Sequence, residues 1–331
     1  MKNAKLSQKC VFIFITYVSL FNSLEINNNV KNINGLLCYH HYSDYENLDS
    51  ELFLFNFTDN TLKSISSNFN LTIKHSMNGH INPKTGNSLV FMGINIEYDR
   101  WAIYYIENLK KFIQKPYIPT LLTDFGLSFR DEDPKWDFKG EKIVIKRNFR
   151  SIVEINISTK ESNILFSDLE SEFSMPFYNK NGSKIIYCEG PGKNGLIGIY
   201  DIENNSRKTL YDRENVFDYY PITYINSMNG EEKIFFSSWK NEYNRHDQIY
   251  LGDYDGNEAV LLAFNGDEFD SSDSCQVDNE WIIISSTREG NTYDLYLANI
   301  KSGEVINLNE INEGINTEDK HELGASFWME L

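Results

Sequence analysis

The stretch WIIISSTREGNTYDLYLANIKSGEVINL, residues Trp281–Leu308, decides the fold. It contains an apolar run, Trp281–Ser286, an alternating segment, Tyr293–Asn299, and a short third segment, Glu304–Leu308. Residues that favour turns separate these segments: Arg288-Glu289-Gly290-Asn291 and Lys301-Ser302-Gly303. The pattern predicts a meander of antiparallel strands. Because a single meander leaves its faces uncovered, we expect similar meanders to pack against it.

Related meanders recur along the chain. In each three-stranded meander, the middle strand contains a hydrophobic residue, and an aromatic residue follows it in every copy but one. These pairs are Leu52-Phe53, Ile103-Tyr104, Val153-Glu154, Ile199-Tyr200, Ile249-Tyr250 and Leu295-Tyr296. Successive copies are 46 to 51 residues apart. Such a period, with four short strands in each unit, is typical of a β-propeller, whose units are blades around a central channel.

Both ends of the repeat are incomplete. Leu36–Tyr42, Glu51–Phe57 and Thr61–Ile65 correspond to the second, third and fourth strands of a blade that lacks its first strand. Ala325–Trp328 corresponds to a first strand that no second strand follows. We therefore expect the C-terminal strand to pair beside Leu36–Tyr42, which closes the ring and removes an open sheet edge.

One first strand is expected for each blade: Ala325–Trp328, Gly79–Asn82, Pro134–Asp137, Pro176–Asn179, Pro221–Tyr224 and Asp273–Gln276. The sequence thus predicts an all-β fold, a six-bladed β-propeller of four-stranded antiparallel blades over residues 34–331.

The N-terminal residues have the pattern of an export signal. Three lysines precede an apolar run from Val11 to Phe21, which is short for a bilayer span. We interpret residues 1–23 as a signal peptide or an uncleaved anchor and residues 24–33 as a linker. The prediction is an exported protein, extracellular, periplasmic or associated with the envelope, that touches a membrane only through such an anchor.

Charge and cysteine content restrict the partners. The net charge is −17 and the pI about 4.8, so no basic stripe is available for the phosphates of DNA or RNA. Of the four cysteines, Cys10 lies in the leader, and Cys38 and Cys188 lie in apolar strands. These favour buried free thiols over a disulfide framework. The expected partner is a protein or glycan ligand, and the chain is expected to be a monomer.

Three segments resemble the repeat of the TolB-like propeller family: Pro134–Gly140 with Lys142-Ile143-Val144, Pro176–Ile185, and Ser286–Tyr296. The first two are similar to P-x-W-S-P-D-G-K-x-I-x-F, and the third is similar to S-x-R-x-G-x-x-D-I-Y. The resemblance covers about residues 34–331 and implies the six-bladed fold. It leaves the function open, because this fold carries many functions. TolB has an α/β domain ahead of its propeller, and no such segment is expected here between the leader and Leu36.

Two motifs that resemble ligand-binding loops are better explained as hairpins. Gly190–Gly195 matches G-x-G-x-x-G, but strand-like segments flank it on both sides, which favours a hairpin loop over a dinucleotide site. Asp253–Glu258 is similar to the start of a calcium loop, but Phe264 stands where the distal glutamate is needed. A hairpin turn at Asp255-Gly256 is the better interpretation.

One constellation follows from the ring itself. Residues just before the first strands should surround one mouth of the channel: His75, Asp131, Phe173, Asp218, Asp270 and Glu322. Four of these six are carboxylates, and His321 adjoins Glu322. Carboxylates with imidazoles suit a divalent cation such as calcium, an amine or a peptide terminus. The alternative is that these short acidic residues cap turns through the backbone. Tyr219 and Tyr220 lie in the same segments and would either stack on sugar rings or pack in the core.

Two functions remain open. The first is a binding or scaffold module, without catalysis, that recognises a protein or carbohydrate through one face or through the acidic mouth. The alternative is a metal-dependent polysaccharide lyase, which requires His75, His80 and His321 to converge on one site.

Overall fold

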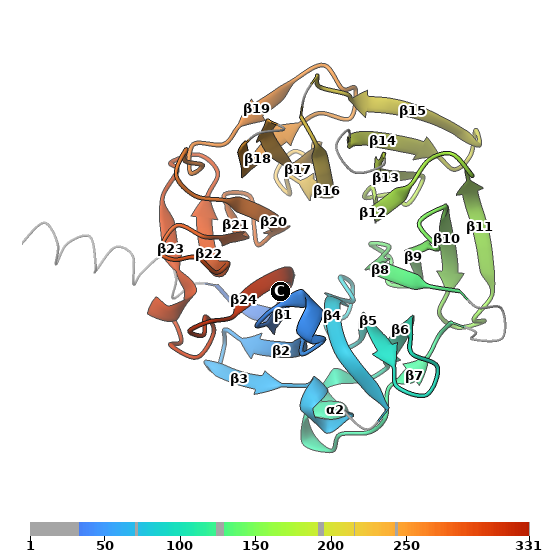
Figure 1. Cartoon of the computed structure of the whole chain (residues 1–331), viewed down its shortest axis with the longest axis vertical. Helices are drawn as coiled ribbons and strands as arrows, with labels where there is room; N and C mark the ends of the chain where they lie inside the picture. Colours follow the sequence, from blue (N-terminus) through green and yellow to red (C-terminus); the bar gives the residue numbers. More distant parts are fainter. Residues whose placement is uncertain are drawn as a thin grey trace, which may run out of the picture.

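The computed structural model describes residues 33–69, 72–123, 129–190, 195–214, 216–241 and 244–330. The predicted leader and all but residue 33 of the predicted linker lie outside these ranges. The described residues form six antiparallel four-stranded sheets arranged as blades around a central channel (Figure 1). The predicted all-β six-bladed propeller is confirmed. None of the helices in these ranges has the length and apolar character needed to span a bilayer.

The strands follow one another outward from the channel within each blade. The inner strands are β24 (His321–Met329), β4 (Ile73–Ile81), β8 (Asp131–Trp136), β12 (Phe173–Tyr178), β16 (Asp218–Ile225) and β20 (Ser271–Gln276). The second strands are β1 (Gly35–Tyr42), β5 (Leu89–Asn95), β9 (Lys142–Arg147), β13 (Lys184–Glu189), β17 (Glu232–Asn241) and β21 (Trp281–Ser286). The third strands are β2 (Glu51–Asn56), β6 (Arg100–Ile106), β10 (Ser151–Asn156), β14 (Leu196–Asp201), β18 (Asn244–Gly252) and β22 (Asp294–Asn299). The outer strands are β3 (Thr61–Ser64), β7 (Thr120–Leu121), β11 (Ser162–Ser167), β15 (Ser206–Tyr211), β19 (Ala259–Leu261) and β23 (Val305–Asn307).

The last strand closes the ring as predicted. β24 pairs antiparallel with β1, with Leu36 opposite Trp328 and Cys38 opposite Ser326. One blade therefore has the order β24-β1-β2-β3 and joins the two ends of the chain (Figure 1). The hydroxyl of Ser326 also accepts a hydrogen bond from the backbone N–H of Ile81 in the next blade, at 3.0 Å. The closing strand is thus tied to β1 of its own blade, at a boundary here called the seam, and to the next blade.

The second strands are apolar without alternation because both of their faces are covered. Every residue of β5 is buried, and so are five of the six residues of β21. Each sheet packs between two neighbouring sheets, so successive side chains enter different cores. This explains why Trp281–Ser286 appears in the sequence as an uninterrupted apolar run.

Each inner strand begins earlier than the sequence predicted. Its register with the second strand shifts midway, at a bulge whose first residue has a positive φ between 50° and 63°: Asn78, Asp133, Met175, Tyr220, Asp273 or Gly324. Three of these bulges continue with the prolines that were taken as strand starts, Pro134, Pro176 and Pro221. A bulge accommodates proline because proline has no N–H to donate to the ladder. The strand therefore extends through the proline instead of beginning there.

The blade that contains β4 departs from the simple repeat. A short helix, α2 (Leu109–Gln114), follows β6, and its outer strand β7 has only two residues. The Asn108 side chain caps the helix by accepting from the backbone N–H of Lys111, and Leu109 and Phe112 are buried. Short 3-10 helices lie at η1 (Tyr45–Asn47), η2 (Ser66–Asn68) and η4 (Leu308–Glu310). None of these was predicted.

The glycine-rich motif and the motif that resembles a calcium loop both lie between paired antiparallel strands. β13 and β14 pair antiparallel on either side of the glycine-rich segment, of which residues 191–194 lie outside the described residues. β18 and β19 flank the other motif, where a side-chain oxygen of Asp253 accepts from the backbone N–H groups of Asp255, Gly256 and Asn257. The predicted hairpin at Asp255-Gly256 is confirmed.

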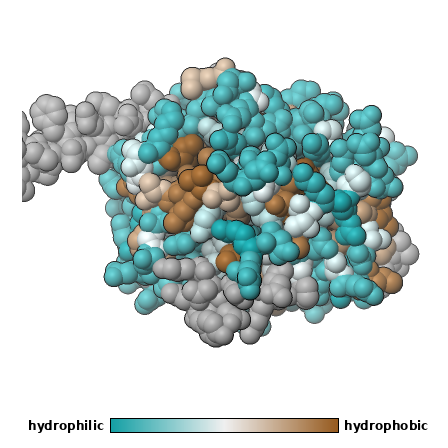
Figure 2. All heavy atoms as spheres, turned by 90° about the horizontal axis from the view of Figure 1, so that it is seen from above, coloured by the Kyte–Doolittle hydropathy of each residue, from teal (hydrophilic) through white to brown (hydrophobic). Residues whose placement is uncertain are grey.

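The cysteines lie inside the fold, and its outer rim is largely hydrophilic. Cys38, Cys188 and Cys275 are free and buried, and burial raises the pKa of each thiol to about 12. Figure 2 shows the rim on the side of β15 and β19, where hydrophilic residues cover most of the surface and apolar residues gather in patches. Outer strands of two to six residues leave little edge for another chain to pair with.

Candidate functional site: the two ends of the central channel

The inner strands begin at one end of the channel, here called the start face, and finish at the other, the end face. Four predicted mouth residues share one place at the start face, two residues before the bulge: Asp131, Phe173, Asp218 and Glu322. His75 and Asp270 lie one residue earlier in their blades, where Ser76 and Ser271 hold the corresponding place. The acidic ring is therefore less complete than the sequence suggested.

Two of its carboxylates form ion pairs with arginines. Asp131 accepts from Nε and Nη2 of Arg147 at 2.8 and 2.9 Å, and both side chains are largely buried. Burial raises the pKa of Asp131, whereas the Arg147 guanidinium opposes that shift. Asp218 is fully buried against the guanidinium of Arg213, whose Nε lies 3.0 Å from Oδ2. Bidentate pairs of this kind fix both groups, so these carboxylates face protein cations.

Glu322 and Asp270 are also engaged. Oε1 of Glu322 accepts from the N–H and the hydroxyl of Thr317 at 3.2 and 2.7 Å and lies 3.6 Å from Nδ1 of His41. Its other oxygen is buried without a hydrogen-bond partner among the described residues. Asp270 accepts from the backbone N–H of Asp247 at 3.0 Å, and Nδ1 of His246 lies 3.6 Å away.

The three histidines needed for a metal-dependent lyase do not converge. Nδ1 of His75 accepts from the N–H of Ser50 at 3.1 Å, and Nδ1 of His321 accepts from the N–H of Tyr293 at 3.2 Å. Nδ1 of His80 accepts from the N–H of Trp136 at 2.9 Å, near the end face. Among the described residues, no group of three or more His, Cys, Asp or Glu side chains has an arrangement that fits a metal ion. The convergence that the lyase alternative requires is therefore not found among the described residues.

His75 and His321 instead belong to a row of rings on the start face, here called the aromatic row: Tyr293, His321, Tyr42, Tyr45, His75 and Trp101. Neighbouring ring centroids along this row are 5.2 to 6.3 Å apart. The row crosses three blades, because ring closure brings β22, β24 and β4 together. Tyr45 is its most accessible member, with 42% of its surface exposed.

The two predicted tyrosines have different surroundings. Tyr219 is mostly buried, with its ring 5.8 Å from that of Phe217. Tyr220 is the bulge residue of β16 and lies inside the channel, where burial raises the pKa of its phenol well above the usual value. Neither ring joins the aromatic row.

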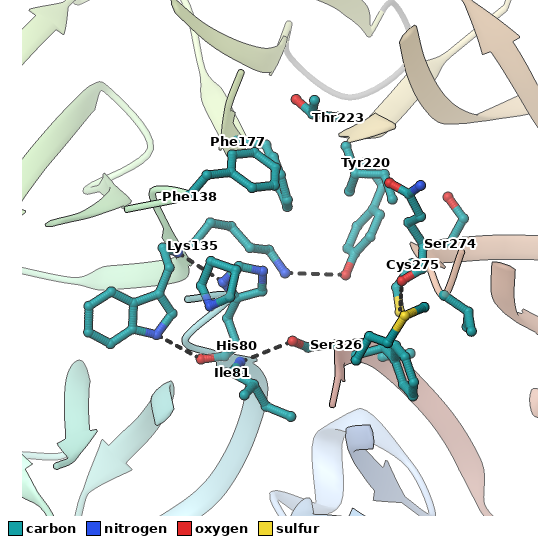
Figure 3. Close-up of a pocket in the computed structure, with 18 residues that line it drawn as sticks. His80, Ile81, Lys135, Phe138, Phe177, Tyr220, Thr223, Ser274, Cys275 and Ser326 are labelled. Atoms are coloured by element: carbon teal, nitrogen blue, oxygen red, sulfur yellow. Dashed lines mark hydrogen bonds between the residues drawn. The ribbon is translucent and has the colours of Figure 1, made fainter. Parts of the chain in front are cut away.

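A pocket at the end face was not predicted. Its volume is about 190 Å³, and all six inner strands line it (Figure 3). The lining is: His80, Ile81, Pro83, Lys135, Trp136, Phe138, Phe177, Tyr220, Ile222, Thr223, Ser274, Cys275, Gln276, Val277, Ala325, Ser326, Phe327 and Met329. The pocket is therefore the end of the channel itself, a usual place for a ligand where secondary elements converge.

Lys135 extends into this pocket (Figure 3). It is 4% exposed, and its ammonium nitrogen lies 3.5 Å from the phenolic oxygen of Tyr220 and 5.4 Å from the centroid of that ring. Burial lowers the pKa of Lys135, whereas Asp133 and Asp273 oppose that shift. Within the described residues, no carboxylate forms an ion pair with it. Sequence reasoning missed this residue because a lysine between Pro134 and Trp136 is usually solvated.

No family model matches the chain, and no curated protein matches it. Solved structures do resemble it. TolB from Acinetobacter baumannii aligns with a TM-score of 0.65 and 16% identity, over 88% of this chain and 66% of the TolB chain. Hydrazine synthase from Kuenenia stuttgartiensis aligns with a TM-score of 0.66 and 10% identity, over 91% and 48% of the two chains. The chain thus spans about two thirds of the TolB chain and about half of the hydrazine synthase chain.

A chain of a nidogen–laminin complex aligns with a TM-score of 0.62 and 9% identity, over 89% of this chain and 99% of that one. Proteins that differ this much in function share the architecture, and identities this low concern the fold alone. The chain is a six-bladed β-propeller that is structurally similar to the propeller domains of TolB.

Proposed function

We propose that the protein is an exported binding module, without catalysis of its own, that holds a carbohydrate chain over the aromatic row at the start face. The observation that carries this proposal is the row itself. Its accessible rings, Tyr293, His321, Tyr42 and Tyr45, lie on two adjacent blades, and the row continues into the third blade through the buried His75 and Trp101. Aromatic rings present flat apolar faces, and tyrosine and histidine add polar edges. Sugar rings have the matching character, with apolar C–H faces and hydroxyls at the rim.

Acidic groups adjoin the accessible part of the row. Asp44 and Glu46 flank Tyr45 and are exposed. Asp49 lies nearby in the chain and pairs with Lys320 at 3.1 Å, which places both charges beside the seam. Carboxylates accept hydrogen bonds from sugar hydroxyls, and an ammonium donates to them. The surroundings therefore supply polar contacts around the stacking surface.

The buried histidines His40 and His75 and the three thiols are poorly suited to proton transfer at neutral pH. Burial lowers the pKa of His40 to about 3 and that of His75 to about 4, so both imidazoles are neutral near pH 7. The three thiols have pKa values of about 12 and remain protonated. An efficient general acid or base has a pKa near the working pH, and a reactive thiol has a lowered one.

A glycan array probed with the full chain tests this proposal. We expect binding to at least one class of glycan, and Tyr45→Ala should weaken it by between about twofold and tenfold, the contribution of one stacked ring. Met228→Ala is the control, because Met228 is exposed in the turn between β16 and β17, on the end face. Absence of glycan binding, or equal binding by wild type and Tyr45→Ala, would overturn the proposal, and binding of a protein instead would reassign the ligand.

A further inference from the structure

The end face contains a buried positive charge beside a cavity. A lysine ammonium that leaves water loses much hydration energy, and a carboxylate partner usually compensates. Lys146, one strand away, follows that rule: it lies 3.4 Å from Glu132 and 3.1 Å from Asp133. Lys135 does not, since its one close polar contact in the described structure is the phenolic oxygen of Tyr220, at 3.5 Å. Its remaining N–H groups are available to a ligand in the pocket.

We propose that this pocket binds a small carboxylic acid that carries one apolar ring, with the carboxylate on Lys135 and Tyr220 and the ring against Phe177 and Phe138. This site is separate from the aromatic row, so the inference does not rest on the proposed function.

The donors suit a carboxylate. The ammonium of Lys135 donates toward the oxygen of Tyr220, which leaves the phenolic hydrogen free to point at a bound anion. Tyr220 remains a phenol at neutral pH, because burial raises its pKa. Two ammonium N–H groups and one O–H group can therefore meet the two oxygens of a carboxylate. Hydrogen bonds that involve charged partners are the stronger kind.

Nearby carboxylates maintain the charge on Lys135 without cancelling it through an ion pair. Asp133 and Asp273 both favour the ammonium form. Asp133 is itself paired with Lys146, and Asp273 accepts from the backbone N–H of Gly324 at 3.3 Å. The pocket therefore presents its free charge as a cation.

The size of the pocket limits the ligand. A cavity of about 150 Å³ holds a benzene molecule in a protein core. The end-face pocket, at about 190 Å³, has room for one such ring and a carboxylate. Phe177 and Phe138 contribute an aromatic wall, with ring centroids 6.2 Å apart. Ile222 lines the same pocket and adds an apolar contact.

Several other polar groups of the lining already have partners. Nδ1 of His80 accepts from the N–H of Trp136, and the hydroxyl of Thr223 donates to the carbonyl of Tyr178 at 2.7 Å. The side chain of Gln276 bonds to the N–H and the carbonyl of Ile225, at 2.9 and 2.7 Å. These contacts connect neighbouring blades. Charge recognition in the pocket thus falls to Lys135 and Tyr220.

Calorimetric titration of the full chain tests the proposal with two matched probes, phenylacetate and its neutral amide, phenylacetamide. We expect phenylacetate to bind about 10- to 100-fold more tightly than the amide, the usual effect of hydrogen bonds to a charged group. Lys135→Met should abolish this preference, and Tyr220→Phe should reduce it. Lys110→Met is the control, because Lys110 is exposed on α2, and it should bind like wild type.

A second arm identifies the source of the carboxylate. A tripeptide that ends in phenylalanine is compared with the same peptide amidated at its C-terminus. Tighter binding of the free-acid peptide than of phenylacetate would assign the site to a chain end, and the reverse to a free acid. No binding of either acid up to about 10 mM, or an undiminished preference in Lys135→Met, would overturn the inference. Circular dichroism of each variant verifies its fold.

Discussion

Lys135 on β8 and Tyr220 on β16 meet inside the channel, 3.5 Å apart, although the β12 blade separates their blades along the ring. The contact joins residues 85 positions apart in the sequence, and the arrangement of the blades around one channel places them at the same opening. Nearby, Lys146 is also buried, but it forms ion pairs with Glu132 and Asp133. The two lysines are therefore both buried, and only Lys146 has carboxylate partners among the described residues.

Replacing each lysine by methionine should therefore have opposite effects on stability. Lys135→Met removes a buried charge without a carboxylate partner, and we expect an unchanged or higher free energy of unfolding. Lys146→Met leaves Asp133 buried without its cation, at a cost of about 3–5 kcal/mol, whereas Glu132 keeps its pair with Arg130. Urea unfolding of the two variants measures this difference. A large loss of stability in Lys135→Met would contradict the view that its ammonium is free for a ligand.

The pKa of Asp273 predicts a pH dependence at the acid end. Burial is the main cause that raises this pKa from 3.8 to about 6, so the folded state binds the proton more tightly than the unfolded state. The stabilising effect is complete below pH 3.8 and is lost as the pH rises through 6. We expect the free energy of unfolding to fall across this window in wild type relative to Asp273→Asn. Parallel pH profiles for the two proteins would contradict the prediction.

Two aspartate–arginine pairs differ in burial and should differ in stabilising effect. Asp218→Asn weakens a pair whose carboxylate is fully buried, and we expect a loss of about 3 kcal/mol. The control, Asp168→Asn, changes the solvent-exposed pair with Arg207, where water screens the charges and the loss should be clearly smaller. Thermal unfolding followed by calorimetry measures both. Equal losses would show that burial does not distinguish them.

The closing strand can be tested through a glycine that it covers. Gly86 has a positive φ of 60°, and a Cβ there would collide with the ring of Trp328 on β24. Gly182 has a similar φ of 74° but open space around it. Gly182→Ala should cost about 1 kcal/mol for the backbone alone, and Gly86→Ala clearly more. If both variants lose the same stability, Trp328 does not pack against this turn.

The architecture was predictable because its signal is repeated. The period of the hydrophobic-aromatic pairs and the two incomplete ends specified six blades and a strand exchange, which β24 and β1 confirm. The starts of the inner strands were not predictable from Pro134 or Pro221, since prolines usually interrupt strands and here lie in bulges. His75 and Asp270 lie one residue before the corresponding position, in blades where no proline marks the bulge.

The sites depend on contacts that no local pattern records. The sequence predicted Asp131 and Asp218 as ligand-binding residues, and in the structure they form ion pairs with Arg147 and Arg213. Lys135 was not predicted as a site residue, and the pocket that contains it is lined by strands of all six blades. The aromatic row combines Tyr42 and His321, which come from opposite ends of the chain. Pairing partners and burial across the ring therefore require the three-dimensional structure.

The central claim of the proposed function is that a carbohydrate lies over the aromatic row. The most direct test is titration of the isotope-labelled full chain with a glycan from the array, followed through the ring resonances of tyrosine and histidine. The account predicts saturable shifts at Tyr42, Tyr45 and His321, with no change at Tyr254, which contacts Thr223 on β16 at 2.6 Å. Shifts confined to Tyr254 and Tyr220, with the aromatic row unaffected, would contradict it.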